Sequence, residues 1–437
     1  EGPLLLLAGA GSGKTTVLIN RIANIMRFGR GSDSNEIPSG ITEDDVSFLE
    51  SLTIDDLTDY DRWRADNLCA VEPAVPWSII AITFTNKAAN ELKERLTNML
   101  GPEGQDVWAM TFHSACCRIL RRDIERIGYS KSFTIYDTSD SERVMKDIVK
   151  EMGMEEKDFP AKYVLSVISR QKDNMVDADT MLEQAEMGND YRLLPIARAY
   201  KRYQNRLKEN NALDFDDIIF QTVRLLQENE DVRTYYQRKF RYVLVDEYQD
   251  TNHMQYLLTS LLAGGYENIC VVGDDDQSIY RFRGATIENI LNFEKQYRGS
   301  RVIRLEQNYR STQSILNAAN AVIAHNIGRK GKRLWTANQE GKPITVYEAS
   351  DEGAEANYVA GQIISKSKGK DFKNYAVLYR TNAQSNAMEF AFKRNGIPYR
   401  VIGGMRFFDR AEVKDMLAYL CVINNRADDL RLHRIIN

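Results

Sequence analysis

The sequence predicts an α/β protein with a parallel sheet and a long helical insertion. Short apolar runs alternate with helical patterns, whereas residues 137–234 show almost only helical patterns. The apolar runs lie at residues 4–7, 78–84, 107–114, 241–250 and 268–277. Strands that alternate with helices pair in parallel and are covered on both faces. We therefore expect a sheet whose strands come from both sides of the helical stretch.

The composition is that of a soluble globular protein. The chain has 437 residues, of which 43% are hydrophobic and 27% charged, and this length suits about two to four domains. No stretch is long and apolar enough to span a membrane. The five cysteines, Cys69, Cys116, Cys117, Cys270 and Cys421, are scattered and odd in number. We expect reduced thiols in a cytoplasmic protein, without a zinc site.

Charge is distributed unevenly along the chain. Residues 28–76 contain twelve Asp or Glu and three Arg, which gives this segment a net charge of −9. The net charge of the whole chain is −4, so the rest of the chain carries +5. The global charge is therefore a poor guide to partners. We interpret 28–76 as an inserted, partly helical surface segment. It is either a flexible loop without function or an interaction or autoinhibitory element.

A loop of small residues follows the first apolar run, in "LLLLAGAGSGKTTVL". Because it has almost no side-chain bulk, its backbone N–H groups can turn inward around a polyphosphate. The helical pattern after it adds a helix N-terminus, where anions are favoured. Lys14 would reach the β- and γ-phosphates and the Thr15 hydroxyl would bind Mg²⁺. The candidate ATP-binding residues are Ala8, Gly9, Ala10, Gly11, Ser12, Gly13, Lys14, Thr15 and Thr16. A glycine-rich turn with an incidental lysine is the alternative to this P-loop NTPase interpretation.

Two adjacent carboxylates, Asp246 and Glu247, end the apolar run in "VLVDEYQD". Ligands bind at the carboxyl ends of strands in open parallel sheets. One acid can hold Mg²⁺ while the other takes a proton from water, as nucleotide hydrolysis requires. A charged pair on a solvated surface is the alternative, but the Lys14 loop favours catalysis.

The segment "VVGDDDQSIYRFRGA" again places polar residues after an apolar run. Gln277 is suited to contact a γ-phosphate or the water that attacks it. Residues 280–283 interleave aromatic and cationic side chains, which stack on bases and pair with phosphates. One short segment can thus contact ATP at one end and nucleic acid at the other. The alternative is an aromatic pair buried in a core.

The segment "LEQNYRSTQSIL" places Arg310 before a Ser/Thr helix start. An arginine opposite the phosphate loop can stabilise transition-state charge, with effects on the order of 10³–10⁵ in rate. Tyr309 can stack on the adenine. The alternative for Arg310 is a structural role at the helix start.

Three later apolar runs, at residues 301–311, 343–349 and 374–380, also alternate with helical patterns. By the same reasoning as for the first part of the chain, they predict a second α/β sheet.

Six ordered motifs resemble the UvrD/Rep/PcrA family of superfamily 1 DNA helicases. They are "AGAGSGKT", "AITFTNKAANELKER", "TFHS", "LVDEYQDTN", "VVGDDDQSIYRFRGA" and "LEQNYRST". Residues 211–217 and 375–420 are similar to the same family. The resemblance covers nearly the whole chain apart from residues 28–76.

The resemblance implies a motor of two RecA-like domains. ATP would bind in the cleft between them, and each cycle would step the protein 3′ to 5′ along single-stranded DNA. The expected domains are a first RecA-like domain at 1–112 and 206–285, a helical insertion at 113–205, the first half of a second RecA-like domain at 286–402 and the start of a second insertion at 403–437. The chain is accordingly expected to be incomplete at both ends.

The family also implies roles for the nucleotide-site residues. Thr15 and Asp246 would hold Mg²⁺, and Gln277 would sense the γ-phosphate. Arg310 would reach the γ-phosphate from the second domain. The residues implied to bind or hydrolyse MgATP are Lys14, Thr15, Asp246, Glu247, Gln277, Tyr309 and Arg310.

A second set of residues is implied to bind DNA. These residues are Thr83, Phe84, His113, Tyr280, Arg281, Phe282, Arg380 and Asn382. For Phe84, which ends an apolar run, core packing is the alternative.

The expected partners are single-stranded DNA, junctions of single- and double-stranded DNA, and repair or transcription proteins, without a membrane. The residues alone leave RNA open as the substrate. Two other functions stay open: the motor subunit of a helicase–nuclease, and a nucleotide-gated module that binds single-stranded nucleic acid without turnover. A P-loop kinase is disfavoured, because "TFTN" and "YRFRG" would have no role in it.

Overall fold

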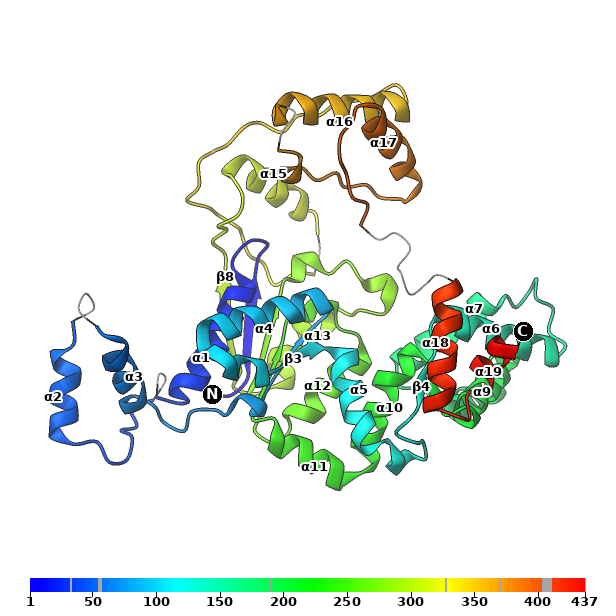
Figure 1. The fold of residues 1–437 in the computed structure, drawn as a ribbon, viewed down its shortest axis with the longest axis horizontal. Coiled ribbons are helices and arrows are strands. Elements are labelled where there is room, and N and C mark those ends of the chain that lie inside the picture. The colour runs from blue at the N-terminus through cyan, green and yellow to red at the C-terminus, as the bar shows by residue number, and fades with distance from the viewer. Residues whose placement is uncertain are drawn as a thin grey trace. The chain divides into compact units, whose positions relative to one another are not determined.

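In the computed structural model of this chain, all residues are described except 32–33, 54–56, 189, 327, 369–370, 403–410 and 437. The contacts divide the chain into two compact units, one of residues 1–341 with 418–437 and one of residues 342–417 (Figure 1). Part of the predicted second insertion, residues 403–410, lies outside the described residues. The domain boundaries given above stay predictions.

The first unit contains a six-stranded parallel sheet in the order β3-β2-β6-β7-β1-β8 (Figure 1). Its strands are β1 (Leu4–Ala8), β2 (Ile79–Thr83), β3 (Trp108–Thr111), β6 (Tyr242–Val245), β7 (Ile269–Gly273) and β8 (Arg301–Leu305). Every residue of β1, β2, β6 and β7 is buried. Strands covered on both faces are continuously apolar, which explains the runs seen in the sequence. The predicted α/β fold class is confirmed.

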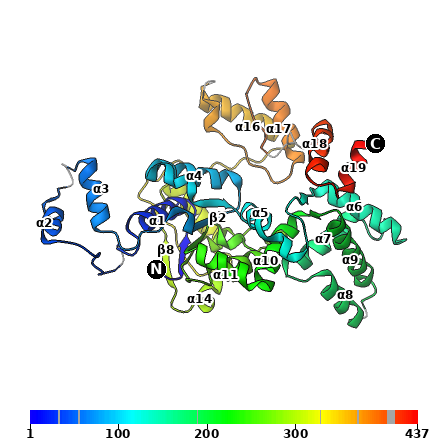
Figure 2. The same cartoon turned by 60° about the horizontal axis from the view of Figure 1, so that its bottom comes forward.

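Helices cover both faces of this sheet (Figure 2). Alternate residues of each strand point to opposite faces, so Leu5 and Leu7 belong to one core and Leu4 and Leu6 to the other. The first core contains α5 (Phe112–Asp123), α10 (Phe215–Glu228), α11 (Glu230–Lys239) and α12 (His253–Ala263), and the second contains α1 (Lys14–Phe28) and α4 (Asn86–Leu100).

The long stretch after β3 is helical, as predicted. It comprises α6 (Thr138–Glu151), α7 (Ala161–Asp173), α8 (Ala178–Met187) and α9 (Leu193–Glu209), which share a core of their own. The short strands β4 (Thr134–Ile135) and β5 (Ala212–Leu213) pair in parallel where this region meets the sheet. Residues near the end of the chain pack on it, because Asn425 Nδ2 donates to Thr134 Oγ1 over 2.9 Å and Arg431 forms an ion pair with Asp140.

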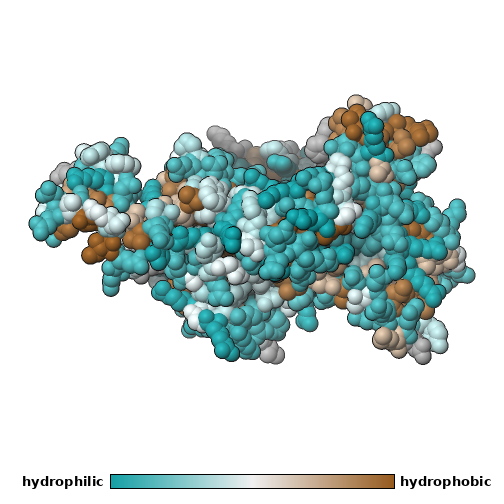
Figure 3. Space-filling model, turned by 90° about the horizontal axis from the view of Figure 1, so that it is seen from below, coloured by the Kyte–Doolittle hydropathy of each residue, from teal (hydrophilic) through white to brown (hydrophobic). Residues whose placement is uncertain are grey.

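The acidic segment forms two capped helices, α2 (Glu43–Ser51) and α3 (Asp59–Leu68). Thr42 and Thr58 start them with capping boxes, and neither helix has a buried residue among those described. The predicted partial helicity is thus confirmed. Hydrophobic residues are visible on this part of the molecule, at the left of Figure 3. The exposed apolar or aromatic residues of the segment include Ile37, Val46, Tyr60 and Trp63.

The remaining helices of the first unit are α13 (Glu288–Leu291), α14 (Phe293–Gln296), α15 (Gln313–Ile323) and α19 (Asp429–Ile436). A further helix, α18 (Ala411–Asn424), begins in the second unit and ends in the first. No described helix is long and apolar enough to cross a membrane. All five cysteines are free.

The second unit packs α16 (Glu352–Ser367) against α17 (Ala383–Arg394). No strand forms among its described residues, so the strands predicted at 343–349 and 374–380 are wrong. Their apolar residues have no neighbouring strand to pair with, and 343–349 is largely exposed. A third predicted strand, in 301–311, does form, but it is β8 and it pairs with β1 of the first sheet.

Candidate nucleotide site and nucleic-acid interface

The phosphate loop joins β1 to the N-terminus of α1. Gly11 and Gly13 have φ values of 68° and 83°, which only glycine adopts readily. Ser12 Oγ donates to the Gly9 carbonyl over 2.8 Å and closes the turn. Ala8, where a stricter motif has glycine, is a buried strand residue without positive φ, so its methyl group costs nothing. The loop therefore presents the start of a 15-residue helix to an anion.

Lys14 and Glu247 meet at this loop. Lys14 Nζ lies 2.8 Å from Glu247 Oε2, although the two residues are 233 positions apart. The strand β6 ends at Val245, and Glu247 adopts a left-handed backbone conformation with φ 50°. Such backbone strain in a non-glycine residue clusters at functional sites. The turn delivers the carboxylate to the lysine and unites the first two sequence-predicted sites.

A surplus of negative charge surrounds this ion pair. Asp246 is only 7% exposed, and burial followed by the charge of Glu247 raises its pKa to about 6. The same two causes raise the pKa of Asp250 to about 6. Asp250 Oδ1 is also buried without a hydrogen-bond partner. Three carboxylates near one lysine suit an additional cation, so this donor set fits Mg²⁺.

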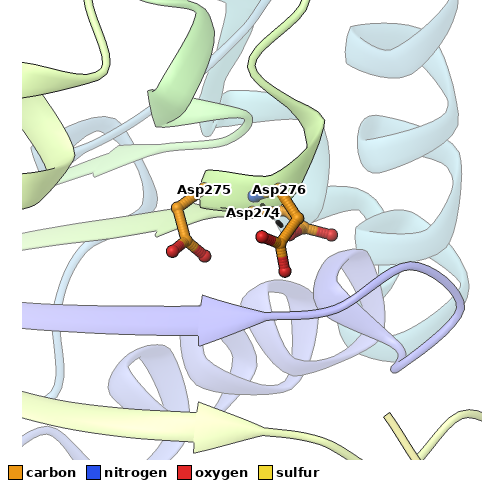
Figure 4. A group of neighbouring side chains, drawn as sticks. All are labelled: Asp274, Asp275 and Asp276. Atoms are coloured by element: carbon orange, nitrogen blue, oxygen red, sulfur yellow. Dashed lines mark hydrogen bonds between the residues drawn. The ribbon is translucent and has the colours of Figure 1, made fainter. Parts of the chain in front are cut away.

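A second acidic group, shown in Figure 4, follows β7 and consists of Asp274, Asp275 and Asp276. Lys332 Nζ lies 2.6 Å from Asp274 Oδ1 and 3.0 Å from Asp276 Oδ2, and it also pairs with Asp275. Arg329 adds a further ion pair with Asp276 at 2.8 Å. Because an ammonium group of the chain already occupies the centre of the cluster, we assign it a structural role rather than a metal site.

Gln277 lies on the same loop as these aspartates. Its side chain donates to the carboxylate of Asp274, and the residue is exposed. A γ-phosphate contact of Gln277 stays a prediction, while its bond to Asp274 fixes the side chain near the carboxyl end of β7.

The residues after β8 lie against the phosphate loop. Asn308 Nδ2 donates to the Ala10 carbonyl over 2.7 Å, and the Tyr309 N–H donates to the Gly11 carbonyl over 3.0 Å. Asn308 Oδ1 also accepts from the N–H groups of Arg310 and Ser311. Tyr309 and Arg310 are exposed beside the loop, as their predicted contacts with ATP require.

Asn308 was missed by the sequence analysis. Only 2% of it is exposed, and its side chain bonds this segment to the phosphate loop. Its place in "LEQNYRST", directly before Tyr309 and Arg310, was the signal that could have drawn attention to it.

Three residues predicted to bind DNA are packed rather than open. Thr83 is buried, and its hydroxyl donates to the Thr85 carbonyl over 3.2 Å. Phe84 is half-buried and packs edge-to-face on Phe112, with ring centroids 5.5 Å apart. This packing agrees with the core alternative for Phe84 while leaving part of its ring accessible.

His113 stacks on Phe215 with ring centroids 3.6 Å apart and an interplanar angle of 22°. Burial lowers the pKa of His113 to about 4. The imidazole is therefore neutral at pH 7, and it would contact a nucleic acid as a stacking or hydrogen-bonding group and not as a cation.

Tyr280 and Phe282 stand out as exposed aromatic residues on the loop after β7. Phe282 is 78% exposed and Tyr280 is 38% exposed, with ring centroids 5.9 Å apart. Arg281 between them is also exposed. The alternative of an aromatic pair buried in a core is therefore wrong for these two rings. Arg380 and Asn382, the last two predicted DNA contacts, are exposed residues of the second unit, before α17.

Comparison with known families matches nearly all of this chain. Residues 1–37 and 64–298 match the UvrD/REP helicase N-terminal domain, and residues 303–437 match the UvrD-like helicase C-terminal domain. The chain belongs to the UvrD/Rep helicase family. Residues 38–63, which include α2 and the start of α3, lie outside the match.

Two curated relatives are similar over the whole chain. The ATP-dependent DNA helicase PcrA of Staphylococcus epidermidis is 46% identical over 438 residues, and that of Staphylococcus aureus is 45% identical. In both cases the match covers 100% of this chain and 54% of the relative. The chain thus spans about half the length of these helicases.

Proposed function

We propose that this chain is the ATP-hydrolysing and strand-gripping part of a DNA helicase that moves 3′ to 5′ along single-stranded DNA. The observation that carries the proposal is the meeting of Lys14 and Glu247 at the phosphate loop, 2.8 Å apart. Family membership and the exposed rings of Tyr280 and Phe282 support it.

The nucleotide chemistry follows from the charges at the site. Lys14 and the N–H groups of the loop would bind the β- and γ-phosphates of ATP, which releases Glu247 from its ion pair. Glu247 would then take a proton from the attacking water. Thr15 and Asp246 would hold Mg²⁺, which supplies charge neutralisation of the phosphates. Arg310 would add positive charge at the γ-phosphate.

The grip on DNA follows from exposed rings. Stacking on an aromatic side chain contributes ~1–3 kcal/mol per base and tolerates any sequence. Phe282 and Tyr280 would stack on unpaired bases, and Arg281 would pair with the phosphate backbone. Because bases within a duplex are already stacked on each other, such rings favour single strands and junctions.

ATP hydrolysis by this chain, and by a longer chain that contains it, tests the proposal. We expect hydrolysis that is stimulated by single-stranded DNA. We also expect the protein to accumulate at the 5′ end of an oligonucleotide, which changes the fluorescence of a dye attached there more than that of a dye at the 3′ end. Matched RNA oligonucleotides distinguish the two nucleic acids. If ATP only changes the affinity for the strand, without turnover in either chain, the nucleotide-gated binding module replaces the helicase.

A further inference from the structure

Gln249 lies at the centre of the site but has no role in the function proposed above. It belongs to the short helical turn after Glu247 and is only 1% exposed. Its Nε2 donates to Glu247 Oε2 over 2.9 Å, and its Oε1 accepts from the Asp274 N–H over 2.9 Å. One side chain thus joins the carboxylate at the end of β6 to the backbone at the end of β7.

The orientation of this amide is determined by its partners, which include Asp250, since Nε2 also donates to Asp250 Oδ2 over 3.3 Å. A carboxylate only accepts and a backbone N–H only donates, so the NH₂ group must face Glu247 and the oxygen must face Asp274. Gly273 leaves the room for it, because a Cβ there would lie 2.8 Å from Gln249 Oε1. A glutamate or an apolar residue at position 249 would lose at least one of the bonds.

The same residue also contacts the loop that carries the exposed rings. Ser278 Oγ donates to the Gln249 carbonyl over 3.2 Å, two positions before Tyr280. Asp274, which is bonded to the Gln249 amide, accepts from the side chain of Gln277. Gln249 therefore contacts both ends of the stretch between β7 and the aromatic residues.

We propose that Gln249 is the positioning residue that couples Glu247 to the aromatic loop, an inference that rests on the proposed function. Glu247 Oε2 is shared between Lys14 and Gln249. When a phosphate takes over Lys14, Gln249 becomes the remaining contact that orients Glu247. A strand bound to Tyr280 and Phe282 shifts Ser278 and Asp274, and through Gln249 it adjusts the position of the catalytic carboxylate.

The variant Gln249→Met tests this role, because methionine keeps the length of the side chain and removes its hydrogen bonds to Glu247, Asp250 and Asp274. Gln237→Met is the matched control, since Gln237 also makes one interior hydrogen bond, to the Leu261 carbonyl, away from the site. Both would be made in the longer helicase chain. We expect Gln249→Met to bind ATP and single-stranded DNA within about twofold of the parent, with stimulation of hydrolysis by DNA reduced about tenfold or more.

Hydrogen exchange of the backbone amides of residues 278–285, measured with and without a non-hydrolysable ATP analogue, tests the coupling between the nucleotide site and the aromatic loop in the absence of DNA. The analogue should change exchange there in the parent and in Gln237→Met but not in Gln249→Met. If Gln249→Met fails to fold, Gln249→Asn, which is too short to reach both partners, must show the same losses.

The outcomes separate the two proposals. A parent without stimulation by DNA contradicts the proposed function, and the exchange experiment then still decides the role of Gln249. A stimulated parent with equally stimulated Gln249 variants, or an unchanged exchange response, overturns the role of Gln249 alone.

Discussion

At the phosphate loop, Lys14 and Glu247 are paired and partly shielded from solvent, whereas Tyr280 and Phe282 on the loop after β7 are exposed. Lys14 is bonded to Glu247, and Asp246 is almost completely covered. Phe282, by contrast, has most of its ring in solvent. Hydrolysis of a phosphate needs charges fixed in advance, while a grip that ignores base sequence needs open apolar faces. In the proposed function, the two loops would meet these opposite needs at the carboxyl ends of neighbouring strands.

His113 and Phe84 do not fit either group cleanly. Both were predicted to bind DNA, yet His113 stacks on Phe215 and Phe84 packs on Phe112. The exposure of both side chains is intermediate, between that of the covered Asp246 and that of the exposed Phe282. Substitutions at Lys14, Glu247, Phe282 and His113 test this difference between the two loops.

Replacing Lys14 by alanine should abolish ATP hydrolysis, with a loss on the order of 10³-fold or more. The reason is that the β- and γ-phosphates would lose the ammonium group that follows the phosphate loop. Affinity for single-stranded DNA should stay within about twofold. Steady-state hydrolysis and fluorescence anisotropy measure the two effects, with the exposed Lys146→Ala as control. A folded variant that loses both activities would contradict the separation of the two loops.

Glu247→Gln should reduce hydrolysis by about 10²–10⁴-fold, since the base is removed. Nucleotide binding should be equal or tighter, because Lys14 is no longer held in an ion pair. Single-turnover hydrolysis and titration with a fluorescent ATP analogue give the two numbers. Weaker nucleotide binding would show that Glu247 holds the nucleotide and does not serve as the base.

Phe282→Ala should weaken binding of single-stranded DNA by ~1–3 kcal/mol, about 5- to 150-fold, because one stacking ring is lost. Hydrolysis without DNA should not change. The loss should be similar for oligo-dT and oligo-dA. Tyr266→Ala removes another exposed ring and serves as control. An effect confined to one base would argue for base-specific recognition at this loop.

The variant His113→Asn tests whether His113 acts as a packed structural residue or as a contact for DNA. The unfolded state takes up a proton below about pH 6.5, but the folded state does so only near pH 4. The free energy of unfolding should therefore fall as the pH drops from about 6.5 to 4, by about 1–3 kcal/mol from this residue. Urea unfolding at pH 7 and pH 5 should show this extra loss in the parent and not in the variant. Equal pH dependence with weaker DNA binding would instead place His113 with the exposed rings.

Local sequence patterns were sufficient to predict the buried strands, the phosphate-loop turn and the position of two acidic residues. The short runs of leucine, isoleucine and valine around Leu5 and Val243 are typical of strands buried on both faces, and both form such strands. Gly11 and Gly13 mark a turn that needs positive φ. Asp246 and Glu247 directly follow a strand, so their place at the carboxyl ends of the strands could also be predicted. Each of these inferences depends on residues that are neighbours in the chain.

Contacts between distant segments were decided only by the tertiary structure. No pattern in the sequence shows that Asn308 contacts Ala10, that Lys332 sits among three aspartates, or that Gln249 joins Glu247 to Asp274. The run at 343–349 has the composition of a strand but no partner among the described residues, and it remains unpaired. A strand exists only through its hydrogen-bonded neighbour, and an ion pair only through its counter-charge. Local sequence therefore predicts which groups are available, and long-range packing decides which of them meet.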